Sequence, residues 1–416
     1  MKNRSGSTWI FLFVIFVTQT GSRMWSFHGL PDVVFDICEF LSALALVIVV
    51  AMHYHAIDEE RMQFRFNVLL FLLLPLVSMI PAAIFHNQSF WLSFSILRTN
   101  FAWLLYFVLH IFKVPRKFVI TWMTIVGVVW ALLTIIQQFT FPYYWFYTRD
   151  AITSGDFFRA GLYRFMLDPH LFGTFIVIYY YNSFLVNWKW QSLLIVIIGL
   201  VGFYCYTTRQ VALAVVICMV IISVMQPGRA KYVALSVMAI GFILLLLNLD
   251  ALLGSYIELT SEQLAKDNIR IYSAKYFLFE YWPHWTTVLF GNGAEHMNSD
   301  YGKEIAGLGE NLGYFKGDVG LISPLSTFGI LYVLNIIFVN LKGLRPSYYG
   351  TAKSYFLPAL FLYSLMLLLI SEHYAYPAAI PYFCMIFYLV DKSYWKRRGE
   401  LPDEAEEEDH LLRRAG

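Results

Sequence analysis

Residues 66–85 read FNVLLFLLLPLVSMIPAAIF, a stretch without a single charged side chain. A helix needs about 20 mostly apolar residues to cross a bilayer, where lipid offers the backbone no hydrogen-bond partner. This stretch therefore predicts a transmembrane helix. Comparable stretches on both sides of it give twelve candidate spans, at approximately 8–21, 33–52, 66–85, 90–112, 118–139, 167–187, 191–207, 209–226, 231–250, 319–341, 355–371 and 374–391.

The composition of the whole chain supports this interpretation. Of its 416 residues 59% are hydrophobic and 14% charged, against about 45–50% and about 25% in soluble domains, which excludes a water-soluble enzyme. The 30 Lys and Arg nearly balance the 28 Asp and Glu, so no basic field indicates nucleic acid. The four cysteines are widely separated without a CxxC motif, which argues against a disulfide framework or structural zinc.

Charge asymmetry predicts the orientation. Most Lys and Arg residues lie on one side of the twelve spans, and cytoplasmic loops retain such residues, so both termini are expected in the cytoplasm. The first span, preceded by Lys2 and Arg4, also fits a signal-peptide core; we expect it to be retained. The expected fold is an all-α polytopic membrane protein with one transmembrane domain (1–399), a long outer loop (approximately 251–317) and a disordered acidic tail (400–416).

That outer loop contains an amphipathic, helix-like part at 261–282, followed by the turn Gly291-Asn292-Gly293. Ionisable residues within or beside membrane spans are functional candidates by default, and here they share the predicted outer side. They are Arg98, Arg159, Arg164, Asp168, His170, Arg209, Arg270, Asp318, Glu372 and His373. A polar, arginine-rich cavity that faces outward is the simplest common explanation.

Arginine suits such a cavity because its planar guanidinium binds phosphate oxygens in a bidentate fork. A lipid-linked diphosphate combines an apolar tail with two phosphates and would match these surfaces. Asp318, or else Glu372 or His373, would take a proton from an attacking hydroxyl. Structural explanations stand beside these roles: Arg98 fits an intramembrane ion pair, and Asp318 fits a helix N-cap.

Four segments carry a family resemblance through their order and shared side. They are Arg159-Ala-Gly-Leu-Tyr-Arg164 with Asp168-Pro-His-Leu-Phe-Gly173; Tyr206-Thr-Thr-Arg209-Gln-Val-Ala-Leu213; Arg270-Ile-Tyr-Ser-Ala-Lys275 with Phe290-Gly-Asn-Gly293; and Asp318-Val-Gly-Leu-Ile-Ser-Pro-Leu-Ser-Thr-Phe-Gly329. Together they resemble the bacterial O-antigen polymerase and O-antigen ligase superfamily. The resemblance covers roughly residues 155–341 and the number of spans.

The resemblance implies a metal-independent, inverting glycosyltransferase of the multispanning GT-C type. It would use undecaprenyl-diphosphate-linked glycan as donor and acceptor at the periplasmic face of the bacterial inner membrane, without a cofactor. Membrane lipid and a chain-length regulator are the further implied partners. In that picture Arg209 and Arg270 hold the diphosphate, Asp318 is catalytic, and Arg98, Arg159, Arg164, His170, Glu372 and His373 bind substrate.

Two departures from the family pattern bear on this expectation. Asp318 stands where ligases carry a base-like histidine, which favours a polymerase of O-antigen, capsule or exopolysaccharide over a ligase. The arginine-to-glycine spacing of some polymerases is not reproduced after Arg159, Arg164 or Arg270.

Three alternatives stay open. An O-antigen ligase would share every feature except the acceptor. A flippase or transporter is disfavoured because its charges should spread along a path through repeated halves, which the sequence lacks. A metal-dependent lipid-phosphate-sugar transferase could use Asp32, Asp36 and Glu39 as ligands, although their spacing is loose.

Overall fold

The computed structural model describes residues 4–20, 24–25, 30–57, 59–141, 143, 158–159, 161–163, 165, 167–227, 231–232, 235–236, 239, 269–369 and 373–399. Within these ranges the regular structure is helical apart from one small β-hairpin. The first part comprises α1 (Arg4–Thr20), α2 (Asp32–Met52), the 3-10 helices η1 (Tyr54–Ala56) and η2 (Glu59–Arg61), α3 (Arg65–Val77), α4 (Met79–His86), α5 (Phe90–Leu97), the 3-10 helix η3 (Arg98–Leu104), α6 (Leu105–Ile111) and α7 (Arg116–Thr140).

The hairpin and the remaining helices follow. They are β1 (Phe158–Arg159), β2 (Leu162–Tyr163), α8 (His170–Asn187), α9 (Trp190–Tyr206), α10 (Arg209–Met225), α13 (Ile269–Lys275), the π-helix η4 (Tyr276–Glu280), α14 (Trp285–Phe290), α15 (Asp300–Leu312), η5 (Lys316–Asp318), α16 (Ile322–Phe328), α17 (Ile330–Gly343), η6 (Pro346–Tyr348), η7 (Ala352–Ser354), α18 (Phe356–Leu367), η8 (Pro377–Ala379) and α19 (Ile380–Arg397).

The helices suit a membrane. Four helical stretches among the described residues are long and apolar enough to cross one: Asp32–Met52, Arg65–His86, Phe90–Ile111 and Arg116–Thr140. Five apolar helices are shorter: Trp9–Thr20, Trp190–Tyr206, Gln210–Met225, Ile330–Gly343 and Ala352–Leu367. Large apolar side chains stay exposed along them, which is expected where the surrounding solvent is lipid. The chain is an α-helical protein of membrane character.

Several expected spans differ in detail. The span expected at 90–112 has a 3-10 segment, η3, in its middle, and the one expected at 319–341 is broken into α16 and α17 at Gly329. The last helix begins at Ile380 rather than near residue 374, because a turn and the short η8 come first. The expected span 231–250 lies almost entirely outside the described residues, so the number twelve stays a prediction.

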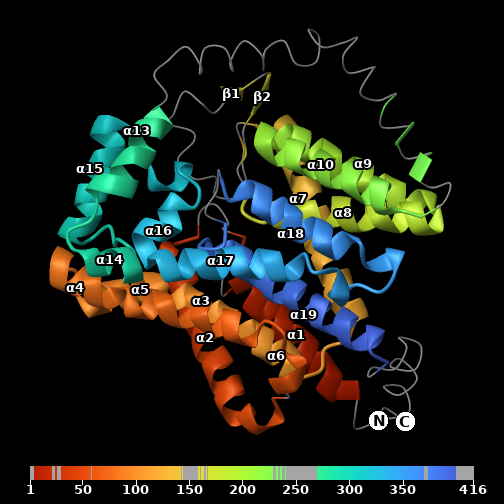
Figure 1. Cartoon of the computed structure of the whole chain (residues 1–416), viewed down its shortest axis with the longest axis horizontal. Helices are drawn as coiled ribbons and strands as arrows, with labels where there is room; N and C mark the ends of the chain where they lie inside the picture. Colours follow the sequence, from red (N-terminus) through yellow and green to blue (C-terminus); the bar gives the residue numbers. More distant parts are fainter. Residues whose placement is uncertain are drawn as a thin grey trace.

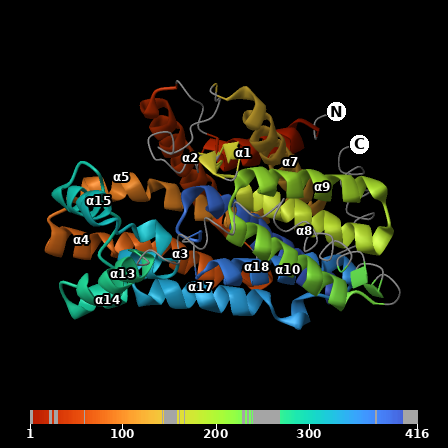
Figure 2. The same ribbon diagram turned by 90° about the horizontal axis from the view of Figure 1, so that it is seen from above.

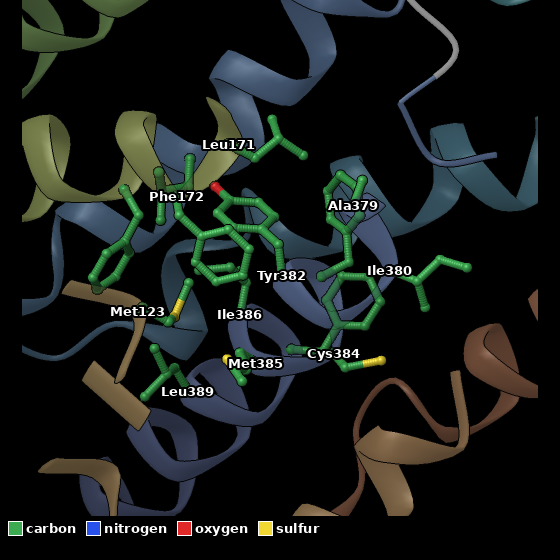
Figure 3. Close-up of a cluster of buried hydrophobic side chains, with 14 of the residues drawn as sticks. Met123, Leu171, Phe172, Ala379, Ile380, Tyr382, Cys384, Met385, Ile386 and Leu389 are labelled. Carbon is green, nitrogen blue, oxygen red and sulfur yellow. The ribbon is translucent and has the colours of Figure 1, made fainter. Parts of the chain in front are cut away.

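Helix α19 forms the centre of the molecule. Its residues from Ile380 to Asp391 are all buried, and it packs against α6, α7 and η3. Figure 3 shows this core, where Tyr382 of α19 meets Phe172 of α8; their ring centroids lie 5.6 Å apart, edge to face. A helix that is apolar on every side is buried on every side.

Close approach between helices depends on glycine elsewhere in the bundle. Helices α7, α8 and α9 pack against one another. A Cβ on Gly173 would lie 2.2 Å from an indole carbon of Trp130, and a Cβ on Gly127 would lie 2.4 Å from the carbonyl oxygen of Phe172. Small residues at such contacts let helix backbones approach in the membrane, where packing drives association.

The outer segment, residues 269–319, has a small core of its own and sits at one end of the bundle. Phe277, Tyr281, Tyr301, Ile305 and Val319 form this core. Figures 1 and 2 both show α13, α14 and α15 gathered beside α4 and α5 at that end. The amphipathic helix expected at 261–282 is described only from Ile269, and helix α15 was not predicted.

The predicted turn Gly291-Asn292-Gly293 is confirmed, and it joins the outer segment to the bundle. The backbone N–H groups of Asn292 and Gly293 donate to the carbonyl oxygens of Ser326 and Thr327, at 3.0 and 2.9 Å. Gly291 and Gly329 both have positive φ, near +80°. A Cβ on Gly291 would clash with the carbonyl oxygen of Thr327 near the end of α16, so this position requires glycine.

Candidate functional site

A cavity of about 810 Å³ lies where the outer segment meets the bundle. Its walls come from the α5–η3 junction, the segment 294–318 with α15 and η5, helix α16 and the loop before η8. The lining residues are Ile96, Leu97, Thr99, Asn100, Ala294, Glu295, Met297, Gly302, Ile305, Ala306, Gly309, Tyr314, Phe315, Lys316, Gly317, Asp318, Ser323, Thr327, Phe328, Ala375, Tyr376 and Pro377. They come from the predicted outer loop 251–317 and from the parts of the predicted spans 90–112, 319–341 and 374–391 that are closest to that side.

An ion pair stands in the cavity wall. Lys316 Nζ donates to Glu295 Oε2 at 2.8 Å. The lysine side chain is only 7% exposed and the glutamate 23%. Both residues line the cavity, and Glu295 is the more accessible member of the pair.

Aromatic rings enclose the lysine. Its Nζ lies 5.1 Å from the ring centroid of Tyr281 and 5.9 Å from that of Tyr301, distances at which a cation is attracted to the ring face. The two tyrosine hydroxyls are hydrogen-bonded to each other. Burial raises the pKa of both well above the ordinary value, so both are neutral at physiological pH.

The charge of Lys316 is maintained despite its burial. Burial alone would lower its pKa, but the neighbouring Glu295 carboxylate outweighs this and the net pKa is raised. The lysine is therefore a cation whose counter-ion is Glu295, since a buried charge needs a partner.

One buried glutamine fixes the segment that carries Glu295. Gln88, between α4 and α5, donates from Nε2 to the carbonyl oxygen of Ala294 at 2.8 Å. Its Oε1 accepts from the backbone N–H of His296 at 2.9 Å and from Ser299 Oγ at 2.8 Å. The backbone on both sides of Glu295 is thus anchored to the helical bundle.

Asp318, expected to be catalytic, does line the cavity. It ends η5 and its side chain is exposed, with no hydrogen bond to another described residue. Its expected helix-capping role is not what the structure shows, because α16 begins only at Ile322. Helix α13, which carries the exposed Arg270, packs beside η5. The structure thus brings these two elements together.

Arg98 is engaged by acidic residues of α2. Its guanidinium forms ion pairs with Asp36 and, at 2.6 Å, with Glu39, which is only 2% exposed. The neighbouring Thr99 and Asn100 line the cavity, whereas Arg98 does not. This arrangement is the ion pair that the sequence left open as an alternative, and it pairs two of the three candidate metal ligands, Asp36 and Glu39, with a guanidinium.

One tyrosine of the cavity wall connects it to Asp168, just before α8. Tyr376, a lining residue, donates its hydroxyl to Asp168 Oδ1. The ring of His170 stacks on Tyr206 at the end of α9, with centroids 5.6 Å apart, so His170 lies beside the turn that precedes Arg209. His373 is buried against Ser364, 2.8 Å from its Oγ, and is not among the lining residues.

Four expected site residues cannot be placed. The side chains of Arg159 and Arg209 lie outside the described residues, although Arg159 ends β1 and Arg209 begins α10. Arg164 and Glu372 lie wholly outside them. Their expected roles stay predictions.

A second buried charged cluster was missed by the sequence analysis. The carboxylate of Asp391, on α19, accepts hydrogen bonds from Tyr106 Oη at 2.5 Å and from the backbone N–H of Gln63 at 3.2 Å, and it pairs with His110 Nε2 at 3.0 Å. At 1.5 Å per residue, Asp391 lies about 16 Å along α19 from Ile380, which follows the cavity loop. In the sequence, the sign of this cluster is a single aspartate, Asp391, at the end of the predicted apolar span 374–391.

Glu295 and Lys316 were also missed. Each is a charged residue close to a glycine, in the runs Gly293-Ala-Glu295 and Phe315-Lys316-Gly317. Among the described residues, no group of three or more His, Cys, Asp or Glu side chains is placed to hold a metal ion. Comparison with protein-family models finds no match, and neither does comparison with curated proteins.

Proposed function

We propose that this chain is a membrane glycosyltransferase that polymerises undecaprenyl-diphosphate-linked repeat units at the periplasmic face of the bacterial inner membrane. The observation that carries the proposal is the cavity. It unites carboxylates, hydroxyls and a buried cation with apolar walls, at the end of the bundle that the charge distribution assigns to the outer side.

The volume and lining of the cavity support a glycan substrate. About 810 Å³ lies within the usual range for ligand pockets, about 300–1,000 Å³. Glu295, Asp318 and Asn100 offer hydrogen-bonding groups for sugar hydroxyls, and Tyr314 and Phe315 offer aromatic surface for ring faces.

The surroundings support a lipid-linked donor. Ile96 lines the cavity and is itself exposed. Phe90 and Trp91, earlier on the same helix α5, expose large apolar surfaces. A polyprenyl tail in the bilayer could therefore lie against α5 while its diphosphate sits at the cavity.

The resemblance assigns the diphosphate to Arg209 and Arg270, and this remains part of the proposal. Cations placed around the leaving diphosphate would stabilise the charge that develops there in the transition state. Alanine at either position should abolish glycan transfer without loss of expression or membrane insertion. Normal glycan in both variants would refute the diphosphate role.

The deciding experiment is the size profile of surface glycan in cells that lack the protein. Collapse to a single repeat unit on its anchor is the result expected for a polymerase. Long chains that persist on the lipid carrier without reaching their acceptor would instead identify a ligase.

A transporter of lipid-linked glycan is a second candidate because of one observation. Asp391 of α19 pairs with His110 of α6, about 16 Å along α19 from the cavity loop, and charged groups spread along the bundle are expected of a transporter. In that case deletion would leave the lipid-linked units on the cytoplasmic side of the membrane, where added glycosidase cannot reach them in intact spheroplasts.

A further inference from the structure

The accessible carboxylate of the cavity ion pair has the geometry of a general base. Glu295 lines the cavity and is partly exposed, while its partner Lys316 is almost fully buried. A general base must reach the substrate and be oriented by a further group, the relation seen in catalytic triads. Lys316 supplies that orientation through its 2.8 Å hydrogen bond to Oε2.

The orientation is reinforced on both sides. The rings of Tyr281 and Tyr301 hold the ammonium group, and Gln88 holds the backbone next to Glu295. Asp318 has neither kind of support, since its side chain is exposed without a hydrogen bond to another described residue. Preorganisation therefore distinguishes the two carboxylates in the same cavity.

We propose that Glu295 is the catalytic base that activates the acceptor hydroxyl, with Lys316 as its positioning residue. This assignment rests on the proposed function and replaces Asp318 in that role. The acceptor oxygen attacks the anomeric carbon of the donor and its proton passes to the Glu295 carboxylate. The bond from the anomeric carbon to the diphosphate breaks, and the electron pair leaves with the diphosphate. The protonated Glu295 then returns the proton to water.

The test compares purified variants on one substrate. The probe is the undecaprenyl-diphosphate-linked repeat unit extracted from the host strain that lacks this protein, and the product ladder is resolved on a gel. General-base catalysis contributes roughly 100- to 10,000-fold. We therefore expect Glu295→Gln to lower kcat at least about 100-fold while KM changes less than threefold.

Asp318→Asn and Asp300→Asn are the matched carboxylate-to-amide variants. Asp318 lines the same cavity, and its loss of kcat should be much smaller than that of Glu295→Gln. Asp300 is 99% exposed on α15 and outside the cavity, so Asp300→Asn should retain wild-type turnover. A larger loss with Asp318→Asn than with Glu295→Gln would overturn the assignment.

Two further variants separate catalysis from folding. Glu295→Gln leaves Lys316 without its counter-ion, so the double variant with Lys316→Met restores a neutral pair; it should unfold at the wild-type temperature and still lack turnover. Lys316→Met alone should lower kcat with little change in KM, because the carboxylate loses the 2.8 Å hydrogen bond that orients it. An increase in KM with unchanged kcat would instead make Lys316 a substrate-binding cation and overturn its positioning role.

The outcomes separate this assignment from the proposed function. No transfer by the wild-type protein, with the repeat unit intact, would overturn the proposed function and the assignment with it. Active wild type together with a Glu295→Gln variant within threefold of its kcat would overturn the assignment alone.

Discussion

Gly291→Ala tests the joint between the outer segment and the bundle. Gly291 ends α14 with φ of +80°, and an added Cβ would lie 2.1 Å from the carbonyl oxygen of Thr327. That oxygen belongs to the backbone and already accepts a hydrogen bond from Gly293. It cannot turn away without disturbing the joint.

The magnitude follows from two contributions. A positive φ costs an L residue about 1–2 kcal/mol. Displacing the end of α16 would also weaken the hydrogen bonds from Asn292 and Gly293, each worth about 0.5–1.5 kcal/mol. Together these give about 2–5 kcal/mol of lost stability. Thr327 lines the cavity, so glycan transfer should fall as well.

The assay is thermal unfolding of the purified protein in detergent, followed by the fluorescence of its 12 tryptophans. Gly161→Ala is the matched control, since Gly161 has the same φ of +80° but nothing within 4 Å of the added Cβ; it should lose only the backbone contribution. Gly307→Ala, within helix α15 and 3.6 Å from the nearest side-chain atom, should be neutral or slightly stabilising. The reasoning fails if Gly291→Ala unfolds no more readily than Gly161→Ala.

The same unfolding assay checks three further predictions. Arg98→Met should cost about 3–5 kcal/mol because it removes the guanidinium that faces buried Glu39, and Glu39→Met in the same chain should recover most of it; a stable single variant with weakened substrate binding would show a ligand role instead. Asp391→Ala should cost about 3–5 kcal/mol because it leaves Tyr106, His110 and the Gln63 N–H without their shared acceptor, and Tyr106→Phe about 1.5–3 kcal/mol because it removes one donor to the buried carboxylate; equal effects would contradict this ranking. Gly173→Ala should cost about 1–3 kcal/mol through its clash with an indole ring of α7, and wild-type stability would contradict that packing.

The sequence predicted those features that depend on local composition. The helices near 33–52, 66–85 and 118–139 were expected within one or two residues of their observed ends, because length and apolarity alone define such elements. The turn at Gly291-Asn292-Gly293 was likewise predicted, since its residues permit the backbone conformation that it needs.

Features that depend on distant partners were not predictable in this way. The break at Gly329 reflects a carbonyl of Leu289, which would lie 2.2 Å from a Cβ at that position, and no local pattern encodes this contact. Arg98 finds its partner Asp36 at a separation of 62 residues. The sequence places ionisable residues on the predicted outer side. Which of them form ion pairs and which line a cavity depends on contacts between residues that are far apart in the chain.

The same distinction separates Asp318 from Glu295. Asp318 precedes a strongly apolar run, which makes it conspicuous in the sequence, while Glu295 follows a glycine turn in a polar loop. The support that Lys316 gives to Glu295 comes from 21 residues further along the chain. Only the folded arrangement reveals it.

The central position of α19 has a consequence for biogenesis. Every other described helix precedes α19 in the chain and leaves the ribosome before it, yet the residues of α19 from Ile380 to Asp391 are all buried. The helices that precede α19 therefore lack their central packing partner, and stay accessible to chaperones and proteases, until α19 inserts among them. A chain truncated before Ile380 would lack the central helix, so its exposed core surfaces would mark it for cellular quality control.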